Sequence, residues 1–175
     1  MLNPSNPQPQ ALDYEAPDYV ANLQAIYGPP SQAGFGSAVF YEPLDSELLE
    51  RADALEQMAL KHYRYFVGDL WERWGEAAWM MPWKQVYRRQ PGDAHQIVAE
   101  MQAIAPSDAG QSLSLVLTSG DDFEATHRAL SAAYDDATVT DLAIYTLGDG
   151  AAMSGVLVAG YREPGDATFL ILLLD

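Results

Sequence analysis

Residues 139–175, VTDLAIYTLGDGAAMSGVLVAGYREPGDATFLILLLD, carry the strongest structural signal in this chain. They contain three apolar segments, at residues 139–147, 155–161 and 167–174. The sequence Gly-Asp-Gly follows the first segment and Pro-Gly-Asp follows the second, and both are typical of turns. Short apolar strands joined by such turns pair with their neighbours, so the sequence predicts a three-strand antiparallel meander at the C-terminus.

The last of these segments has no polar face. Residues 169–174, Phe-Leu-Ile-Leu-Leu-Leu, are apolar without alternation. A strand with apolar side chains in both directions must be covered on both sides, so we expect it in the interior of the sheet. Helices would pack on one face, and an aromatic segment upstream would cover part of the other. These features predict an α+β fold with a mostly antiparallel sheet.

Helix and strand signals also occur upstream. The clearest is one long amphipathic helix near residues 45–67, whose apolar side chains recur every three or four positions. Gly68 would end this helix, and Pro82 would end the next one. Other expected helices span 18–27, 69–79, 93–105 and 121–134, other expected strands span 39–41, 83–89 and 112–118, and loops are expected at 31–38 and 105–110.

Two of these expectations rest on short local patterns. Leu113, Leu115 and Leu117 alternate with other residues, which predicts a half-buried strand. Asp121 is followed three residues later by Glu124, which predicts a variant of the capping box at the start of the 121–134 helix.

The expected domain organisation is a single globular α+β domain over residues 13–175, since 175 residues suit one domain. Residues 1–12 combine prolines with Asn, Ser and Gln, so we expect a disordered tail. The chain has no cysteine, which excludes disulfides and thiolate chemistry. It begins without an apolar signal segment, and no apolar run is long enough to span a membrane. We therefore expect a soluble, cytoplasmic protein that does not bind membranes.

Charge is distributed unevenly along the chain, whose net charge is −16. Residues 1–50 hold seven acidic side chains and no Lys or Arg, and residues 90–175 hold thirteen acidic side chains and two arginines. Residues 51–89 hold five acidic and seven basic side chains. Nucleic acids require clustered Lys and Arg, so the overall charge argues against a nucleic-acid partner and is compatible with a basic protein.

No residue pattern indicates catalysis or metal binding. His62, His95 and His127 lie in three different expected helices without metal-ligand spacing. The glycines at 148–150 precede a strand, whereas a phosphate loop precedes a helix, so a hairpin turn is the better interpretation. Ser119 lacks the surroundings of a serine nucleophile. We therefore predict a protein that is not an enzyme and needs no cofactor or metal.

Aromatic and basic side chains alternate in one central segment. Eight of the nineteen aromatic residues lie within residues 63–87, including all four tryptophans. One interpretation is that the tryptophans fill the core while the bases pair with acidic flanks. Another is a protein interface or a ligand pocket, because Trp, Tyr and Arg dominate binding energy. The candidate binding residues are Trp71, Trp74, Trp79, Trp83, Tyr87, Arg88 and Arg89.

These observations lead to two main functional hypotheses, and an enzyme that uses carboxylates is a third, least favoured one. The first is a non-enzymatic, acidic protein–protein interaction protein that binds a basic partner, of which an immunity, inhibitor or accessory protein is a concrete form. The second is a small-molecule-binding or sensory module, with a Trp-rich apolar pocket and with Arg88 or Arg89 facing an anionic group. The sequence does not predict the oligomeric state.

Overall fold

The computed structural model describes residues 16–44, 47, 53–104, 107–163 and 165–175. Its centre is a five-stranded sheet with the order β1-β5-β4-β3-β2, in which every neighbouring pair is antiparallel. Strands β3 (Val139–Gly148), β4 (Ser154–Arg162) and β5 (Asp166–Leu174) form the C-terminal meander. Both the α+β class and this meander were predicted from the sequence, and the structure confirms them.

The meander is flanked by two strands from the first half of the chain. Strand β1 (Gly36–Pro43) pairs with β5, and β2 (Lys84–Arg88) pairs with β3. As predicted from its apolar run, β5 lies inside the sheet, between β1 and β4. The start of β1 lies within a segment that we expected to be a loop, so this strand is longer than predicted.

Side chains alternate along the strands and so divide between two apolar cores. In β5, Phe169 and Ile171 belong to one core, while Leu170 and Leu172 belong to the other. All four side chains are at most 6% exposed. This period of two follows from the pleat of a strand, and it explains why a central strand needs apolar residues at successive positions.

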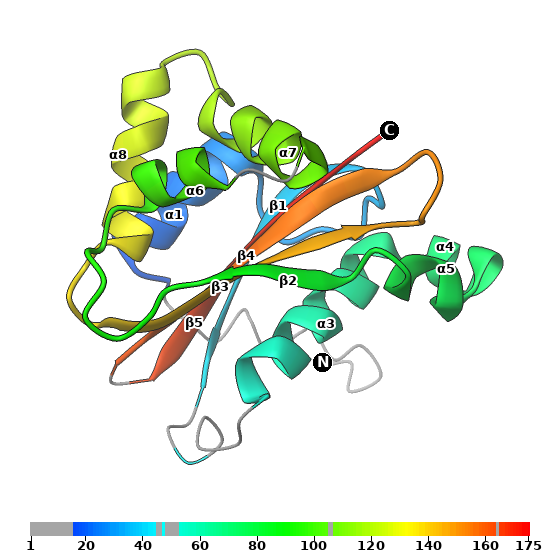
Figure 1. The fold of residues 1–175 in the computed structure, drawn as a ribbon, viewed down its shortest axis with the longest axis horizontal. Helices are drawn as coiled ribbons and strands as arrows, with labels where there is room; N and C mark the ends of the chain where they lie inside the picture. Colours follow the sequence, from blue (N-terminus) through cyan, green and yellow to red (C-terminus); the bar gives the residue numbers. More distant parts are fainter. Residues whose placement is uncertain (1–15, 45–46, 48–52, 105–106, 164) are drawn as a thin grey trace, which may run out of the picture.

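Helices cover both faces of the sheet (Figure 1). One face carries α1 (Asp18–Tyr27), α6 (Ile97–Ala103), α7 (Ser107–Leu117) and α8 (Phe123–Tyr134). The other carries α3 (Ala54–Val67), α4 (Asp69–Trp74) and α5 (Glu76–Met80). The aromatic segment covers part of the second face, as expected, but the expectation that helices pack on one face only is wrong, because α3, α4 and α5 lie on this one.

Helix α3 corresponds to the second half of the long amphipathic helix that the sequence predicts near residues 45–67, but it begins only at Ala54, because Asp53 before it has non-helical dihedral angles. Its buried side chains recur every three or four residues, at Leu55, Ala59, Tyr63 and Phe66. Helix α3 ends at Gly68, as predicted. The expected helix start near residue 45 and the expected tail at residues 1–12 lie outside the described residues.

The expected strand at 112–118 and the expected loop at 105–110 are wrong, because helix α7 spans Ser107–Leu117. Leu113, Val116 and Leu117 are buried, whereas Leu115 is 47% exposed. Buried side chains three and four residues apart are typical of a helix, and the alternation of the leucines, which predicted a strand, is coincidental. The apolar residue that breaks the alternation, Val116, is fully buried and marks the true period.

Three other helix boundaries differ from expectation. The expected helix 69–79 is interrupted at Gly75, which has a φ of +92° and separates α4 from α5. The expected helix 93–105 is shorter, since α6 begins only at Ile97. Helix α8 is capped by Asp122 instead of Asp121: the Asp122 carboxylate accepts hydrogen bonds from the backbone N–H groups of Glu124 and Ala125.

Within the described ranges, each helix is too short or too polar to cross a membrane.

Candidate interaction surface

Two of the four tryptophans are core residues. Trp79 is fully buried and Trp71 is 4% exposed. The indole N–H of Trp79 donates a hydrogen bond of 2.9 Å to the carbonyl of Leu70, so its buried polar group has a partner. Both side chains belong to the core cluster that α3, α4 and α5 form with the sheet. These two residues stabilise the fold and offer little surface to a partner.

Trp74 is different, because it is 45% exposed. Its ring stacks on Trp79 with 5.3 Å between the ring centroids and an angle of 4° between the planes. Trp79 in turn is nearly parallel to Trp71, at 6.4 Å and 9°. The three indole planes are therefore nearly parallel, a group that we call the tryptophan column, and its member Trp74 reaches solvent next to Gly75, where α4 ends.

Trp83 joins the column to the sheet. Its ring stacks on Tyr63 at 5.5 Å and on Tyr145 at 4.6 Å. Its indole N–H donates to the Glu56 carboxylate at 2.9 Å. The Tyr63 hydroxyl lies within hydrogen-bond distance of the Trp79 and Gly148 carbonyls, and burial raises the pKa of this phenol. Partly buried Trp83 is thus held between α3 and β3 and has little freedom to rearrange.

The segment from residue 69 to residue 81, which we call the α4–α5 end, is rich in exposed groups. Met81 is 73% exposed, and it lies against Gly150 in the β3–β4 turn. Asp69, Glu72 and Glu76 are exposed as well. None of these three carboxylates lies within ion-pair distance of a Lys or Arg that the structure describes. The α4–α5 end therefore combines the exposed indole of Trp74, the flexible thioether of Met81 and carboxylates without a described ion-pair partner.

The other candidate binding residues lie elsewhere. Arg89 is buried, and its guanidinium forms a two-pronged ion pair with Glu100 of α6, with N–O distances of 2.9 and 2.6 Å. It also donates to the Tyr134 carbonyl at 2.9 Å. Tyr87 donates its hydroxyl to the same Glu100 carboxylate. This network connects β2 to α6 and α8, which is a structural role.

The ion pair with Arg89 lowers the pKa of Glu100. Burial alone would raise the pKa of this carboxyl, but the hydrogen bonds from Arg89 and Tyr87 outweigh burial, and the pKa lies below its ordinary value of 4.5. For Tyr87, burial and the neighbouring carboxylate raise the pKa to about 12. Both groups therefore keep one protonation state across the neutral range.

The seven candidate residues consequently do not form one site. Trp71, Trp79 and Trp83 pack in the core beneath α3, whereas Tyr87 packs in the core on the opposite face. Arg88 is exposed and pairs with Asp141 at 2.9 Å. The structure leaves Trp74 as the one candidate tryptophan with a large exposed surface.

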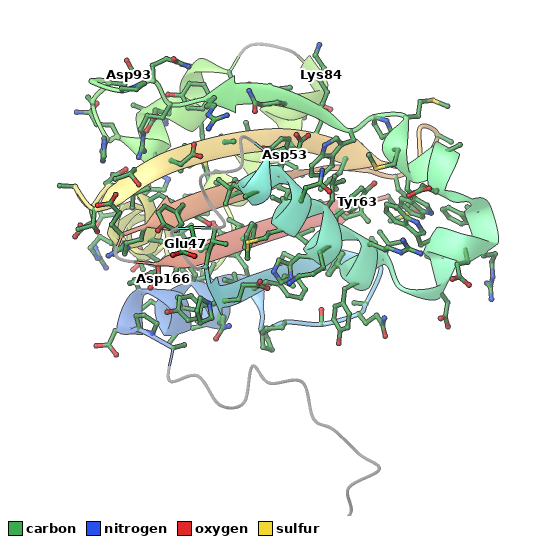
Figure 2. The ribbon with its side chains drawn as sticks, turned by 90° about the horizontal axis from the view of Figure 1, so that it is seen from below. Glu47, Asp53, Tyr63, Lys84, Asp93 and Asp166 are labelled. Atoms are coloured by element: carbon green, nitrogen blue, oxygen red, sulfur yellow. The ribbon has the colours of Figure 1, made fainter. Side chains whose placement is uncertain are left out.

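Most basic side chains have acidic neighbours within the molecule. Besides Arg88 and Arg89, Lys61 pairs with both Glu42 oxygens at 2.9 Å, and Arg162 approaches Asp136 at 3.8 Å. Arg64 instead lies over the Trp71 ring, at 5.8 Å from its centroid. Figure 2 shows α3 lying across its face of the sheet and Lys84 on strand β2. Internal pairing therefore leaves the surface dominated by carboxylates.

The histidines do not converge on a metal site in the described part of the chain, where no group of three potential ligands occurs. His62 lies between the Phe40 and Phe169 rings, with Nε2 at 2.8 Å from Glu42. Burial would raise the pKa of Glu42, but His62 and Lys61 outweigh it and hold the pKa below its ordinary value. Here His62 anchors α3 to β1.

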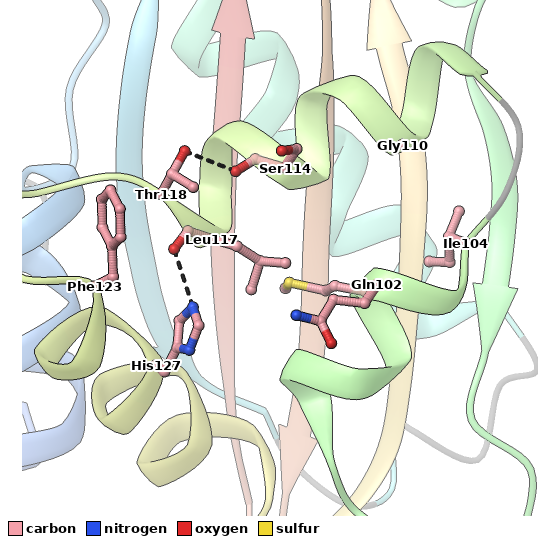
Figure 3. Close-up of a pocket in the computed structure, with 9 residues that line it drawn as sticks. Gln102, Ile104, Gly110, Ser114, Leu117, Thr118, Phe123 and His127 are labelled. Carbon is pink, nitrogen blue, oxygen red and sulfur yellow. Dashed lines mark hydrogen bonds between the residues drawn. The ribbon is translucent and has the colours of Figure 1, made fainter.

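Two of the surface hollows are lined entirely by residues that the structure describes. One, of about 360 Å³, lies beside Trp71 and is lined by Lys61, Arg64, Asp69 and Glu72 among others. The other, of about 350 Å³, lies between α6, α7 and α8. In Figure 3, Gln102 and His127 face each other across the second hollow, and His127 contacts the Leu117 carbonyl at 3.2 Å.

Sequence reasoning missed the second hollow because it took α7 for a strand. A helical interpretation of the apolar residues in α7 would have placed its polar positions at the surface between α6 and α8. The unpaired carboxylates of the α4–α5 end were missed for another reason. The sequence shows their presence, but ion pairing across the fold determines which carboxylates remain free.

No known protein family matches this chain, and no curated protein or solved structure is significantly similar to it.

Proposed function

We propose that this protein is a non-enzymatic interaction protein that binds a basic protein partner through its acidic surface, as an immunity, inhibitor or accessory protein does. The observation that carries the proposal is the internal pairing of basic side chains. Lys61, Arg88, Arg89 and Arg162 all face carboxylates of the same molecule. A chain of net charge −16 then presents a mostly negative surface, which attracts positive partners and repels negative ones.

The α4–α5 end is the best candidate for the contact area. Interfaces combine an aromatic anchor with a polar rim, and Trp is the residue type most enriched among energetically important contacts. Trp74 supplies such an anchor, Met81 an adaptable apolar group and Glu72 and Glu76 a charged rim. We expect steering by charge to set the association rate, and contacts to Trp74 to set the dissociation rate.

The test is a capture experiment from lysate of the organism that encodes the protein, at low and high salt. The variant Asp69→Asn/Glu72→Gln/Glu76→Gln removes charge at the α4–α5 end, and Asp18→Asn/Asp121→Asn/Glu163→Gln removes the same charge from other exposed positions. We expect a basic protein to be captured at low salt and released at high salt, with the first variant weaker than the second. Capture of an acidic partner, or capture insensitive to salt, would exclude the proposal.

A second candidate function, small-molecule binding, is favoured by one specific observation. The indole N–H of Trp71 is buried without a hydrogen-bond partner among the described groups, and Trp71 lines the 360 Å³ hollow beside Arg64. An unpaired buried N–H costs about 1–3 kcal/mol, which a ligand acceptor such as a carboxylate would recover. The measurement is the NMR shift of the Trp71 indole N–H on addition of small carboxylates. An unchanged resonance would exclude this function.

A further inference from the structure

The indole of Trp74 is stacked on one side and exposed in part; we call the side away from Trp79 its open face. Trp79 covers the other side in nearly parallel stacking, at 5.3 Å and 4°. No other ring of the described residues stacks on Trp74, and its side chain is 45% exposed. Trp74 is therefore the member of the tryptophan column that exposes part of its indole to solvent.

This open face is held in place before any partner arrives. Trp79 beneath it is fully buried, and its N–H is fixed by the Leu70 carbonyl at 2.9 Å. Tyr63 packs edge-on against both Trp71 and Trp79. A partner that stacks on Trp74 therefore immobilises little that is not already ordered, and preorganised contacts of this kind gain affinity.

The surroundings of Trp74 favour a positive ligand. Asp69, Glu72 and Glu76 are exposed on the same two short helices, without a described Lys or Arg in ion-pair distance. Arg73 is the one base among them. The guanidinium–ring contacts of the described residues involve Arg64 over Trp71 and Arg162 over Tyr19, so no guanidinium of the described part covers Trp74.

We propose that the open face of Trp74 binds an arginine side chain of the basic partner, an inference that rests on the proposed function. The negative face of an aromatic ring attracts cations, and indole is the strongest such ring. Arginine fits better than lysine because its planar guanidinium stacks on the ring and is more weakly hydrated. Its outward N–H groups remain free to bind a nearby carboxylate such as Glu72 or Glu76 in two-pronged fashion.

A second copy of this chain is a poor occupant of the same face. Two molecules of charge −16 repel each other, and stacking of Trp74 on its own counterpart would bring two sets of the same carboxylates together. A basic segment of a partner protein is instead attracted to these carboxylates.

The test compares short acetylated oligoarginine and oligolysine amides of equal length and charge. Binding is followed through the indole N–H resonances of 15N-labelled protein, assigned by tryptophan substitution. We expect a saturable shift at Trp74 that exceeds those of Trp71 and Trp79. Oligoarginine should bind about threefold more tightly than oligolysine, the margin expected for an exposed cation–ring contact.

Two variants test whether the Trp74 ring itself causes the preference for arginine. Trp74→Leu keeps an apolar side chain and should reduce oligoarginine affinity to that of oligolysine, whereas Trp74→Phe should keep part of the preference. Equal binding of the two peptides by the wild-type protein would overturn the proposal. So would equal shifts of all indoles, or concentration-dependent broadening of the Trp74 signal without peptide, which would indicate self-association.

The same data separate this inference from the proposed function. Binding of both peptides without any arginine preference would remove the role of Trp74 and leave the acidic interaction surface intact. Failure of both peptides to bind at low salt would instead remove the acidic surface as a docking site for basic chains.

Discussion

At the scale of single residues, Trp74 and Trp79 are parallel neighbours in opposite environments. Trp79 is fully buried and Trp74 is 45% exposed. We expect Trp79→Ala to lower the free energy of unfolding by about 3–5 kcal/mol, because it leaves a cavity in the core. Trp74→Ala loses mainly one stacking contact, which costs about 1 kcal/mol. Chemical denaturation of both variants measures the two values.

The comparison also tests the interface hypothesis before any partner is known. If Trp74→Ala unfolds as readily as Trp79→Ala, Trp74 belongs to the core and only the acidic surface supports partner binding. If Trp74→Ala is nearly as stable as the wild type, the exposed ring of Trp74 contributes little to folding and is available for partner binding.

Glu100 makes the stability of the fold depend on pH. Its pKa is lower in the folded protein than the ordinary value of 4.5, so the unfolded chain binds more protons in acid. Its contribution to stability is therefore complete above pH 4.5 and is lost as the pH falls through the folded pKa. We expect the free energy of unfolding to fall with decreasing pH in this window.

The variant Glu100→Gln should be less stable near neutral pH, because buried Arg89 then loses its close charge partner and keeps only Asp135, at 3.6 Å, as an acidic neighbour among the described residues. It should also show a shallower acid dependence than the wild type. The exposed Glu124→Gln serves as a control, since the ion pair that Glu124 forms with Arg128 is 4.0 Å long and solvent-exposed, and the described residues offer it no other. A wild-type acid slope in Glu100→Gln would mean that Glu42 and other carboxylates carry the effect.

At the scale of elements, α7 offers a direct test of helix against strand. The helix buries Val116 and exposes Leu115, whereas a strand with inward leucines would do the reverse. We expect Val116→Glu to cost more than about 3 kcal/mol, because it buries an unpaired charge, and Leu115→Glu to change stability by less than about 0.5 kcal/mol. Thermal unfolding of the pair provides the measurement. The opposite order would contradict the helix.

Local sequence signals predict some of the helices correctly and others wrongly. Helix α1 has the bounds that the sequence predicts, because Gly28 and two prolines stop it. Helix α7 was misassigned because its leucines fit two periods at once, and only Val116 separates them. The break at Gly75 was missed since an isolated glycine is compatible with a helix interior, where it costs only about 1 kcal/mol.

At the scale of the whole molecule, β5 holds the two cores together. Leu172 is 6% exposed and packs beneath the helices of one face. We expect Leu172→Asp to unfold the protein or to cause aggregation, because it places an unpaired charge inside a sheet that is covered on both sides. Leu174→Asp, at the partly exposed end of the same strand, should fold. Circular dichroism and size-exclusion chromatography distinguish the two, and a stable, monomeric Leu172→Asp would contradict the central position of β5.

The α+β class, the meander and the interior place of β5 follow from the order of residues alone. Apolar segments of strand length, turn residues between them and an apolar run without alternation are local properties, and neighbouring strands pair because their connections are short. The same holds for the acidic charge and for the concentration of tryptophan and basic residues in one segment.

The composition of the candidate surface depends on contacts between distant residues. Trp71, Trp74 and Trp79 look alike in the sequence, and packing of α4 and α5 against the sheet buries two of them while leaving Trp74 open. Arg89 pairs with Glu100 across the β2–α6 connection, whereas Glu72 and Glu76 find no described basic partner. Burial and ion pairing depend on separations in space, and a linear pattern specifies these only after the chain has folded.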